Sequence, residues 1–174
     1  LYAEKLYEGF RRDYGLTARI ARYHNIYGPY GAYKGGREKA PAALCRKVAA
    51  SSDLGKLEIW GDGKQTRSFC YIDDCLEGTI RLMNSDYEEP LNIGSDEMVT
   101  INQLADYIIE ISGKDISKEY DLSKPQGVRG RNSDNTLIKE VLGWAPSIPL
   151  KEGLVETYQW VEEMVKGGSE EGSE

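Results

Sequence analysis

The sequence contains no long apolar run and little cysteine. No stretch approaches the roughly 20 consecutive apolar residues that a membrane-spanning helix needs, and no basic segment followed by an apolar one opens the chain, so we expect neither a membrane segment nor a signal peptide. Its three cysteines, Cys45, Cys70 and Cys75, are odd in number and lack the spacing of a zinc site. We expect small, buried or half-buried thiols, a cytoplasmic location and no metal.

The glycine fingerprint of a dinucleotide-binding half is also missing. Neither G-x-G-x-x-G nor G-x-x-G-x-x-G follows a predicted strand in the 174 residues. A complete Rossmann nucleotide-binding half is therefore not part of this sequence. Because the first residue is Leu1 and not Met, we expect that half to lie upstream in the native protein.

Acidic residues outnumber basic ones and give the chain a net charge of -7. This balance argues against nucleic acid as the main partner. The charge is uneven, because residues 161–174 hold five glutamates and one lysine, whereas residues 31–50 hold five basic residues and one glutamate. A basic island in an acidic chain fits a local anionic ligand such as a phosphate, and fits a solvated loop and helix face equally well.

Turn and capping residues predict helices and strands in alternation, which is typical of an α/β fold. We expect helices at 1–14, at 41–50, from Asp73 or Asp74 to 83, from Thr100 or Asn102 onward, from Ser133 or Asp134 to Gly143, and at 150–165. We expect strands at 17–23, 57–60, 68–72, 90–93 and 116–120, the last at a sheet edge. Loops are expected at 24–31 and 124–132, and a disordered acidic tail at 167–174.

Two of four polar, glycine-framed segments lie in the first third of the chain. Asn25 and His24 follow a predicted strand, where ligands of open α/β sheets bind, although an Asn before a turn is more commonly a turn residue. Lys39 and Lys47 are eight residues apart and share a helix face if the helix reaches back to Lys39. Lys47 would suit a phosphate, and Lys39 a reacting carbon if partial burial near other basic residues lowered its pKa, but isolated lysines mostly face solvent.

The other two segments carry arginines. Gln65, Thr66 and Arg67 lie between a glycine turn and a strand, and Arg67 suits a bidentate contact to a phosphate or a sugar hydroxyl. Arg129 and Arg131 lie on a glycine-flexed loop and suit phosphate or guanine contacts. Each segment is equally compatible with a plain surface loop. Their significance depends on whether the fold brings them together.

Five motifs in this order resemble the extended short-chain dehydrogenases/reductases that act on nucleotide sugars, the NAD-dependent epimerase/dehydratase family. The motifs are Arg22–Pro29 (R-x-x-N-x-Y-G-P), Trp60–Asp74 (W-G-D-G-x-Q-x-R-S-F-x-Y-I-D-D), Pro90–Gly94, Arg131–Asp134 and Leu142–Pro146. The resemblance implies the C-terminal part of a Rossmann-type fold over residues 1–166. The last Rossmann elements would occupy about 1–25 and 68–95, and a mixed α/β substrate-binding lobe the rest.

Residues 35–43, 61–69 and 127–135 look like the members of this family that act on GDP-mannose. That likeness implies NAD-dependent oxidation of C4, epimerisation at C3 and C5 by acid/base catalysis, and re-reduction to GDP-L-galactose. It implies that Lys39 is one of two acid/base groups and that His24 is the one cofactor contact here. The implied substrate site comprises Asn25, Glu38, Lys39, Ala40, Lys47, Gln65, Thr66, Arg67 and Arg131, with Lys47 and the arginines at the pyrophosphate and nucleotide end.

The chain also departs from the family's pattern. Tyr2 and Lys5 are three residues apart and do not form the family's Tyr-x-x-x-Lys pair, whose lysine would precede Leu1. The family's second acid/base group, a cysteine, would also lie upstream. We therefore expect these residues to be inactive alone and the complete protein to form a homodimer through a helix near residues 1–14. The alternatives are an epimerase or dehydratase acting on UDP- or dTDP-sugars, and a non-catalytic sugar-nucleotide-binding module.

Overall fold

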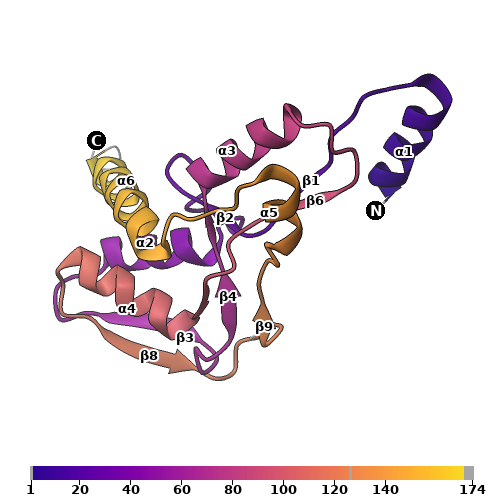
Figure 1. The fold of residues 1–174 in the computed structure, drawn as a ribbon. Helices are drawn as coiled ribbons and strands as arrows, with labels where there is room; N and C mark the ends of the chain where they lie inside the picture. Colours follow the sequence, from indigo (N-terminus) through magenta and orange to yellow (C-terminus); the bar gives the residue numbers. More distant parts are fainter. Residues whose placement is uncertain (1, 126, 171–174) are drawn as a thin grey trace.

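The computed structural model describes residues 2–125 and 127–170, and the chain forms a mixed α/β fold (Figure 1). The helices are α1 (Tyr2–Tyr14), α2 (Ala40–Ala50), α3 (Ile72–Met83), α4 (Ile101–Ser112), α5 (Thr136–Leu142) and α6 (Leu150–Glu170). The strands are β1 (Ala21–Tyr23), β2 (Ile26–Tyr27), β3 (Lys56–Trp60), β4 (Thr66–Ser68), β5 (Cys70–Tyr71), β6 (Leu91–Ile93), β7 (Met98–Thr100), β8 (Ser117–Asp121) and β9 (Gly130–Arg131). None of the helices described is long and apolar enough to cross a bilayer.

The strands pair mostly in parallel. β1 pairs with β6, β2 with β5 and β3 with β8, each in parallel. β4 lies between β7, which is antiparallel to it, and β9, which is parallel. Parallel pairs need long crossover connections, and the helices provide them. The expected edge strand is confirmed as β8, which pairs with β3 and with no other strand of the described residues.

The buried apolar side chains form two clusters. The larger joins α2, α4 and α6, which lie together in Figure 1, and its fully buried side chains include Val48, Leu104 and Leu154. The smaller lies under α3 and α5 and is built from Leu82, Leu91, Ile93 and Ile138.

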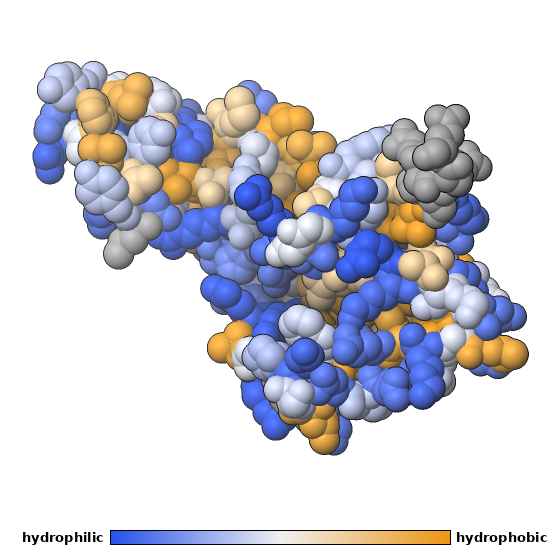
Figure 2. Space-filling model, turned by 180° about the vertical axis from the view of Figure 1, so that it is seen from behind, coloured by the Kyte–Doolittle hydropathy of each residue, from blue (hydrophilic) through white to orange (hydrophobic). Residues whose placement is uncertain are grey.

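Helix α1 stands away from both clusters (Figure 1) and buries none of its residues. Its links to the remainder are polar. Arg22 donates to Glu4 at 2.7 Å, and Arg11 donates to the Glu88 carbonyl at 3.0 Å and to the Glu89 carboxylate at 3.0 Å. Apolar side chains remain uncovered on this projecting arm, as Figure 2 shows, and the most exposed are Tyr2 and Tyr14.

Local signals predicted several element ends correctly. Of the two residues expected to start α4, Thr100 is its N-cap and forms a capping box, because its Oγ1 accepts from the Gln103 backbone N–H while the Gln103 side chain accepts from the Thr100 N–H. Pro41 lies in the first turn of α2, and Gly143 ends α5 in the left-handed conformation. These features depend on residues within a few positions of one another.

Other predicted boundaries were wrong. The strand expected at 17–23 is shorter, because only Ala21–Tyr23 (β1) form a strand, and β2 occupies part of the loop expected at 24–31. The strand expected at 68–72 is divided, because β4 ends at Ser68 and β5 is Cys70–Tyr71. Ile72 is already helical, and the N-cap of α3 is Tyr71 and not Asp73 or Asp74. β7 and β9 were missed because such short strands are defined by their distant partners.

The two C-terminal helices also differ from expectation. The N-cap of α5 is Asn135, whose side chain makes no capping bond, although Asp134 Oδ1 accepts from the Thr136 N–H at 2.9 Å. Helix α6 continues to Glu170 and so enters the segment expected to be a tail. Residues 171–174 lie outside the described residues.

Candidate functional site

Three adjoining pockets form one groove along the predicted site residues. The Trp60 pocket has a volume of about 420 Å³, the Arg67 pocket about 240 Å³ and the His24 pocket about 370 Å³. Ala40, Gln65 and Ile101 line both of the first two, and Asn25 and Lys39 line both of the last two. The groove therefore runs from Trp60, past Lys39, to His24.

Lys39 lies where the Arg67 and His24 pockets meet. It is the N-cap residue of α2 in an extended conformation, and its carbonyl accepts from the Ala43 N–H at 2.9 Å. The helix does not reach back to Lys39, because α2 begins at Ala40, so the condition for a face shared by Lys39 and Lys47 is not met, and Lys47 lines the Trp60 pocket. Lys39 is also exposed, where partial burial was expected, and its side chain is thus open to the groove.

Asn25 lines the same two pockets as Lys39. Its backbone φ is 45°, a conformation that asparagine tolerates better than most residues, so the turn expected after β1 is present. Its Nδ2 donates to the Ser68 carbonyl at 3.0 Å, which fixes the amide orientation. The Asn25 amide oxygen accepts from no residue that the structure describes and can serve a ligand hydroxyl.

The pairing of β4 with β9 brings the two arginine segments together. Arg67 and Arg131 are register partners, and the Thr66 hydroxyl donates to the Arg129 carbonyl at 3.3 Å. Arg67 lines the Arg67 pocket and Arg131 lines the His24 pocket. Thr66 lines none of the three pockets, so its side chain supports the loop and does not reach the groove.

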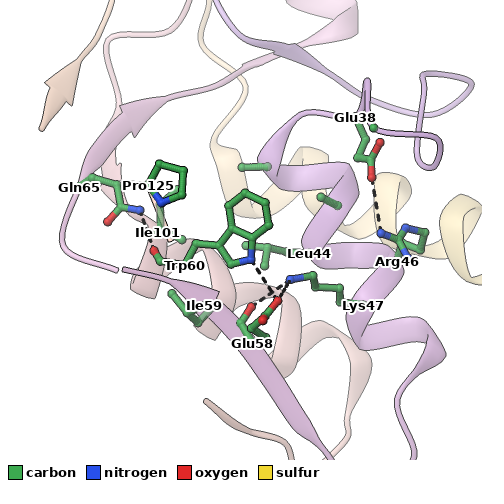
Figure 3. Close-up of a pocket in the computed structure, with 13 residues that line it drawn as sticks. Glu38, Leu44, Arg46, Lys47, Glu58, Ile59, Trp60, Gln65, Ile101 and Pro125 are labelled. Atoms are coloured by element: carbon green, nitrogen blue, oxygen red, sulfur yellow. Dashed lines mark hydrogen bonds and ion pairs between the residues drawn. The ribbon is translucent and has the colours of Figure 1, made fainter. Parts of the chain in front are cut away.

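The Trp60 pocket holds an ordered set of polar contacts (Figure 3). Lys47 Nζ and Trp60 Nε1 both point to one oxygen of Glu58, at 3.1 and 3.0 Å. The Lys47 ammonium, followed by the Trp60 N–H, holds the pKa of Glu58 below its ordinary value. The Lys47 and Lys124 ammonium groups lie 5.9 and 5.7 Å from the centre of the indole ring.

Glu38 completes the α2 side of the Trp60 pocket. Its carboxylate lies 3.5 Å from the Arg46 guanidinium, which also donates to the Tyr33 carbonyl at 3.0 Å. Arg46 is thus committed to the loop that precedes α2. Its positive charge is paired with Glu38, so Arg46 is not an unpaired cation near Lys39.

Sequence reasoning missed Glu58 and Trp60 as groove residues. The signal was available, because β3 alternates exposed and buried positions and Leu57 and Ile59 are its buried residues. A period of two places Glu58 and Trp60 together on the open face of the strand. His24, by contrast, lies in the groove as a pocket-lining residue, and its backbone N–H donates to the Ile93 carbonyl at 3.0 Å.

Comparison with known proteins adds the evolutionary context of this groove. Residues 1–94 match the NAD dependent epimerase/dehydratase family. The chain is 53% identical over its whole length to GDP-mannose 3,5-epimerase of Arabidopsis thaliana, of which it covers 45%, so it spans about half the length of such relatives.

Solved structures share the fold, among them two that hold a nucleotide sugar. UDP-glucose 4-epimerase from Thermotoga maritima, solved with UDP-glucose, is 32% identical and superposes with a TM-score of 0.83 over 94% of this chain and 52% of that one. UDP-glucuronic acid 4-epimerase from Bacillus cereus, solved with UDP-glucuronic acid and NAD, is 28% identical with a TM-score of 0.78 over 92% and 50%.

Proposed function

Since the chain belongs to the NAD dependent epimerase/dehydratase family, we propose that it is the substrate-binding half of an epimerase that converts GDP-mannose to GDP-L-galactose. The observation that carries this proposal is the groove, in which Asn25, Lys39 and Arg67 line a single pocket. The 53% identity to GDP-mannose 3,5-epimerase supports the choice of substrate.

The groove suggests a place for each part of such a ligand. We assign the nucleoside to the Trp60 pocket, which is the largest of the three. Arg67 and Lys47 would neutralise the diphosphate, with Lys47 sharing its charge with Glu58. The hexose would then lie between Asn25 and Lys39, where the amide oxygen accepts from a sugar hydroxyl.

Lys39 would act as one of two acid/base groups. A proton on carbon is not acidic beside an alcohol but becomes acidic beside a ketone, so C3 and C5 exchange protons only after C4 is oxidised. Inverting a centre needs one group on each face of the ring. The Lys39 Nζ would serve one face, and the opposite group would come from a part of the protein that is not in this sequence.

Hydride transfer from C4 and back is the chemistry that NAD supplies when bound. The residues of this chain fit only the substrate-facing side of a cofactor site, because Tyr23 and His24 line the outer end of the groove and the sequence has no glycine fingerprint. We propose that the remainder of the cofactor site is upstream and that these 174 residues alone do not turn over substrate. We further propose a homodimeric, cytoplasmic enzyme.

The decisive test is solvent exchange at the sugar. In the complete protein, Lys39→Ala should reduce deuterium incorporation from heavy water at C3 or C5 of GDP-mannose by a factor of about 100 or more, because it removes the proton-transferring group. Mass spectrometry and proton NMR of the recovered sugar nucleotide measure this, and calorimetry should show that GDP-mannose still binds.

A matched control is Lys34→Ala. Lys34 is an exposed lysine in the same loop and lines none of the three pockets, so its loss should leave exchange unchanged. Exchange at the wild-type rate in Lys39→Ala would remove Lys39 from the mechanism.

A second candidate is an epimerase acting on a UDP-sugar. It is favoured by the TM-score of 0.83 to a UDP-glucose 4-epimerase. Thermal-shift measurements of the complete protein with GDP-, UDP- and dTDP-sugars separate the two, because the preferred nucleotide gives the largest stabilisation.

A further inference from the structure

We infer that Glu58 reads the base of the bound nucleotide and that this base is guanine. The inference rests on the proposed function, because it assumes that the groove binds a nucleotide sugar. Glu58 lines the Trp60 pocket from β3, on the open face of that strand.

The carboxylate of Glu58 is held in place with half of its hydrogen-bonding capacity unused. Lys47 Nζ and Trp60 Nε1 both donate to Oε2, and Lys47 also donates to the Glu58 carbonyl at 3.2 Å. The other oxygen, Oε1, accepts from no described residue, and the side chain is 48% exposed. A carboxylate oriented from one side and open on the other is suited to receive donors from a ligand.

The walls of the pocket suit a flat, apolar-faced group. Leu44, Ile59, Ile101 and Pro125 line it, and the indole of Trp60 is the central aromatic surface in Figure 3. Trp60 is 48% exposed although it is a large hydrophobic side chain. Stacking on an exposed indole is a common way to bind a base, because every base has a π-face.

Charge then selects among the bases. Two of the nearby cations pair within the protein, Lys47 with Glu58, and Arg46 with Glu38 and the Tyr33 carbonyl, while Lys124 lies over the indole ring. The Oε1 atom of Glu58 is a hydrogen-bond acceptor left free by the described residues, so it favours a base that presents hydrogen-bond donors side by side. Guanine presents N1–H and the 2-amino group side by side. Uracil presents one N–H between two carbonyl oxygens, which a carboxylate repels, and adenine and cytosine place a ring acceptor beside the amino group.

The test compares three diphosphates on the complete protein. Calorimetry gives the dissociation constants of GDP, of inosine diphosphate, which lacks only the 2-amino group, and of UDP. The wild type should prefer GDP to inosine diphosphate by about tenfold, the usual effect of one hydrogen bond to a charged group. Glu58→Gln should reduce that ratio toward one and should narrow the preference for GDP over UDP.

The ratio of the dissociation constants for GDP and inosine diphosphate distinguishes recognition of the base from a general change in the charge of the pocket. Glu58→Gln also releases Lys47, which changes the affinity for every diphosphate alike and leaves the ratios unchanged. Glu119→Gln is the matched control, because Glu119 is the register partner of Glu58 on β8, is exposed, and pairs with Lys56 outside the pocket. Glu58→Asp keeps the negative charge but shortens the side chain, so it should also reduce the preference for GDP over inosine diphosphate. This variant replaces the glutamine variant if the latter fails to fold.

Two results overturn the inference in distinguishable ways. If the wild type prefers GDP and both Glu58 variants keep the full GDP to inosine diphosphate ratio, Glu58 does not read the base and the proposed function stands. If the wild type binds UDP more tightly than GDP, or binds none of the three, the proposed function fails as well.

Discussion

At the scale of single residues, the three cysteines show what burial does to reactive groups. Cys45, Cys70 and Cys75 are buried and carry free thiols, which confirms the expectation of buried, unbridged side chains. Burial raises the pKa of Cys45 and of Cys70 to about 12, and raises that of Cys75 as well. A thiol of raised pKa is almost entirely protonated near neutral pH, and the protonated form is a poor nucleophile.

The native chain should therefore react very slowly with a thiolate-specific reagent. Ellman's reagent in mildly alkaline buffer should label free cysteine at once and the native chain at least about 100-fold more slowly, given the raised pKa values. In concentrated guanidinium, all three thiols should react within the dead time. Rapid labelling of the native chain would contradict the burial described for these side chains.

At the scale of elements, the first turn of α3 ties two distant segments together. Asp74 is only 6% exposed, and its Oδ2 accepts from the backbone N–H groups of Ser147 and Ile148, each at 2.8 Å. Glu97 accepts similarly from the Leu150 N–H at 2.7 Å. These two carboxylates fix the loop that leads into α6, and α6 packs on α2, whose first residues line the groove.

Asp74→Ala should destabilise the fold by about 3 kcal/mol, because two backbone donors lose a charged partner in a buried place. Asp73→Ala provides the control one residue away in the same turn, since Asp73 is exposed. Its loss should cost less than about 1 kcal/mol, the usual effect of a charge at a helix N-terminus. Denaturant unfolding of both variants measures the difference, and equal effects would show that the Asp74 contacts do not stabilise the loop.

At the scale of the whole molecule, the helices differ sharply in how they are held. α4 buries Leu104, Ala105 and Ile108 in the larger cluster, whereas α1 buries nothing among the residues described. The exposed faces of α1 and α3 carry apolar side chains, with Phe10 and Met83 43% and 67% exposed. Most helical stability in proteins comes from packing an apolar face, so α1 lacks its main source of stability.

Hydrogen exchange should resolve this difference. In the isolated chain, the amides of α1 should exchange orders of magnitude faster than those of α4, because local opening of α1 breaks no buried contact. Exchange followed by peptide mass spectrometry measures both helices in one experiment. Equal protection would mean that α1 is covered by contacts that the chain makes with itself or with a second copy.

The sequence by itself determined the features that depend on near neighbours. The capping box at Thr100, the proline start of α2 and the glycine end of α5 follow from residues a few positions apart. The order of the motifs was enough to identify the family and the half of the fold. It also indicated Asn25, Lys39 and Arg67, which the fold brings into one pocket, although their roles stay predictions.

Only the tertiary structure decided how distant segments meet. The pairing of Arg67 with Arg131, the partners of Asp74, and the place of Glu58 beside Lys47 each join residues far apart or on different elements. Short strands such as β7 and β9 exist only because β4 pairs with them. The physical reason is that a hydrogen bond or a stacking contact depends on position in space, and spacing along the chain records that position only within a helix or a strand.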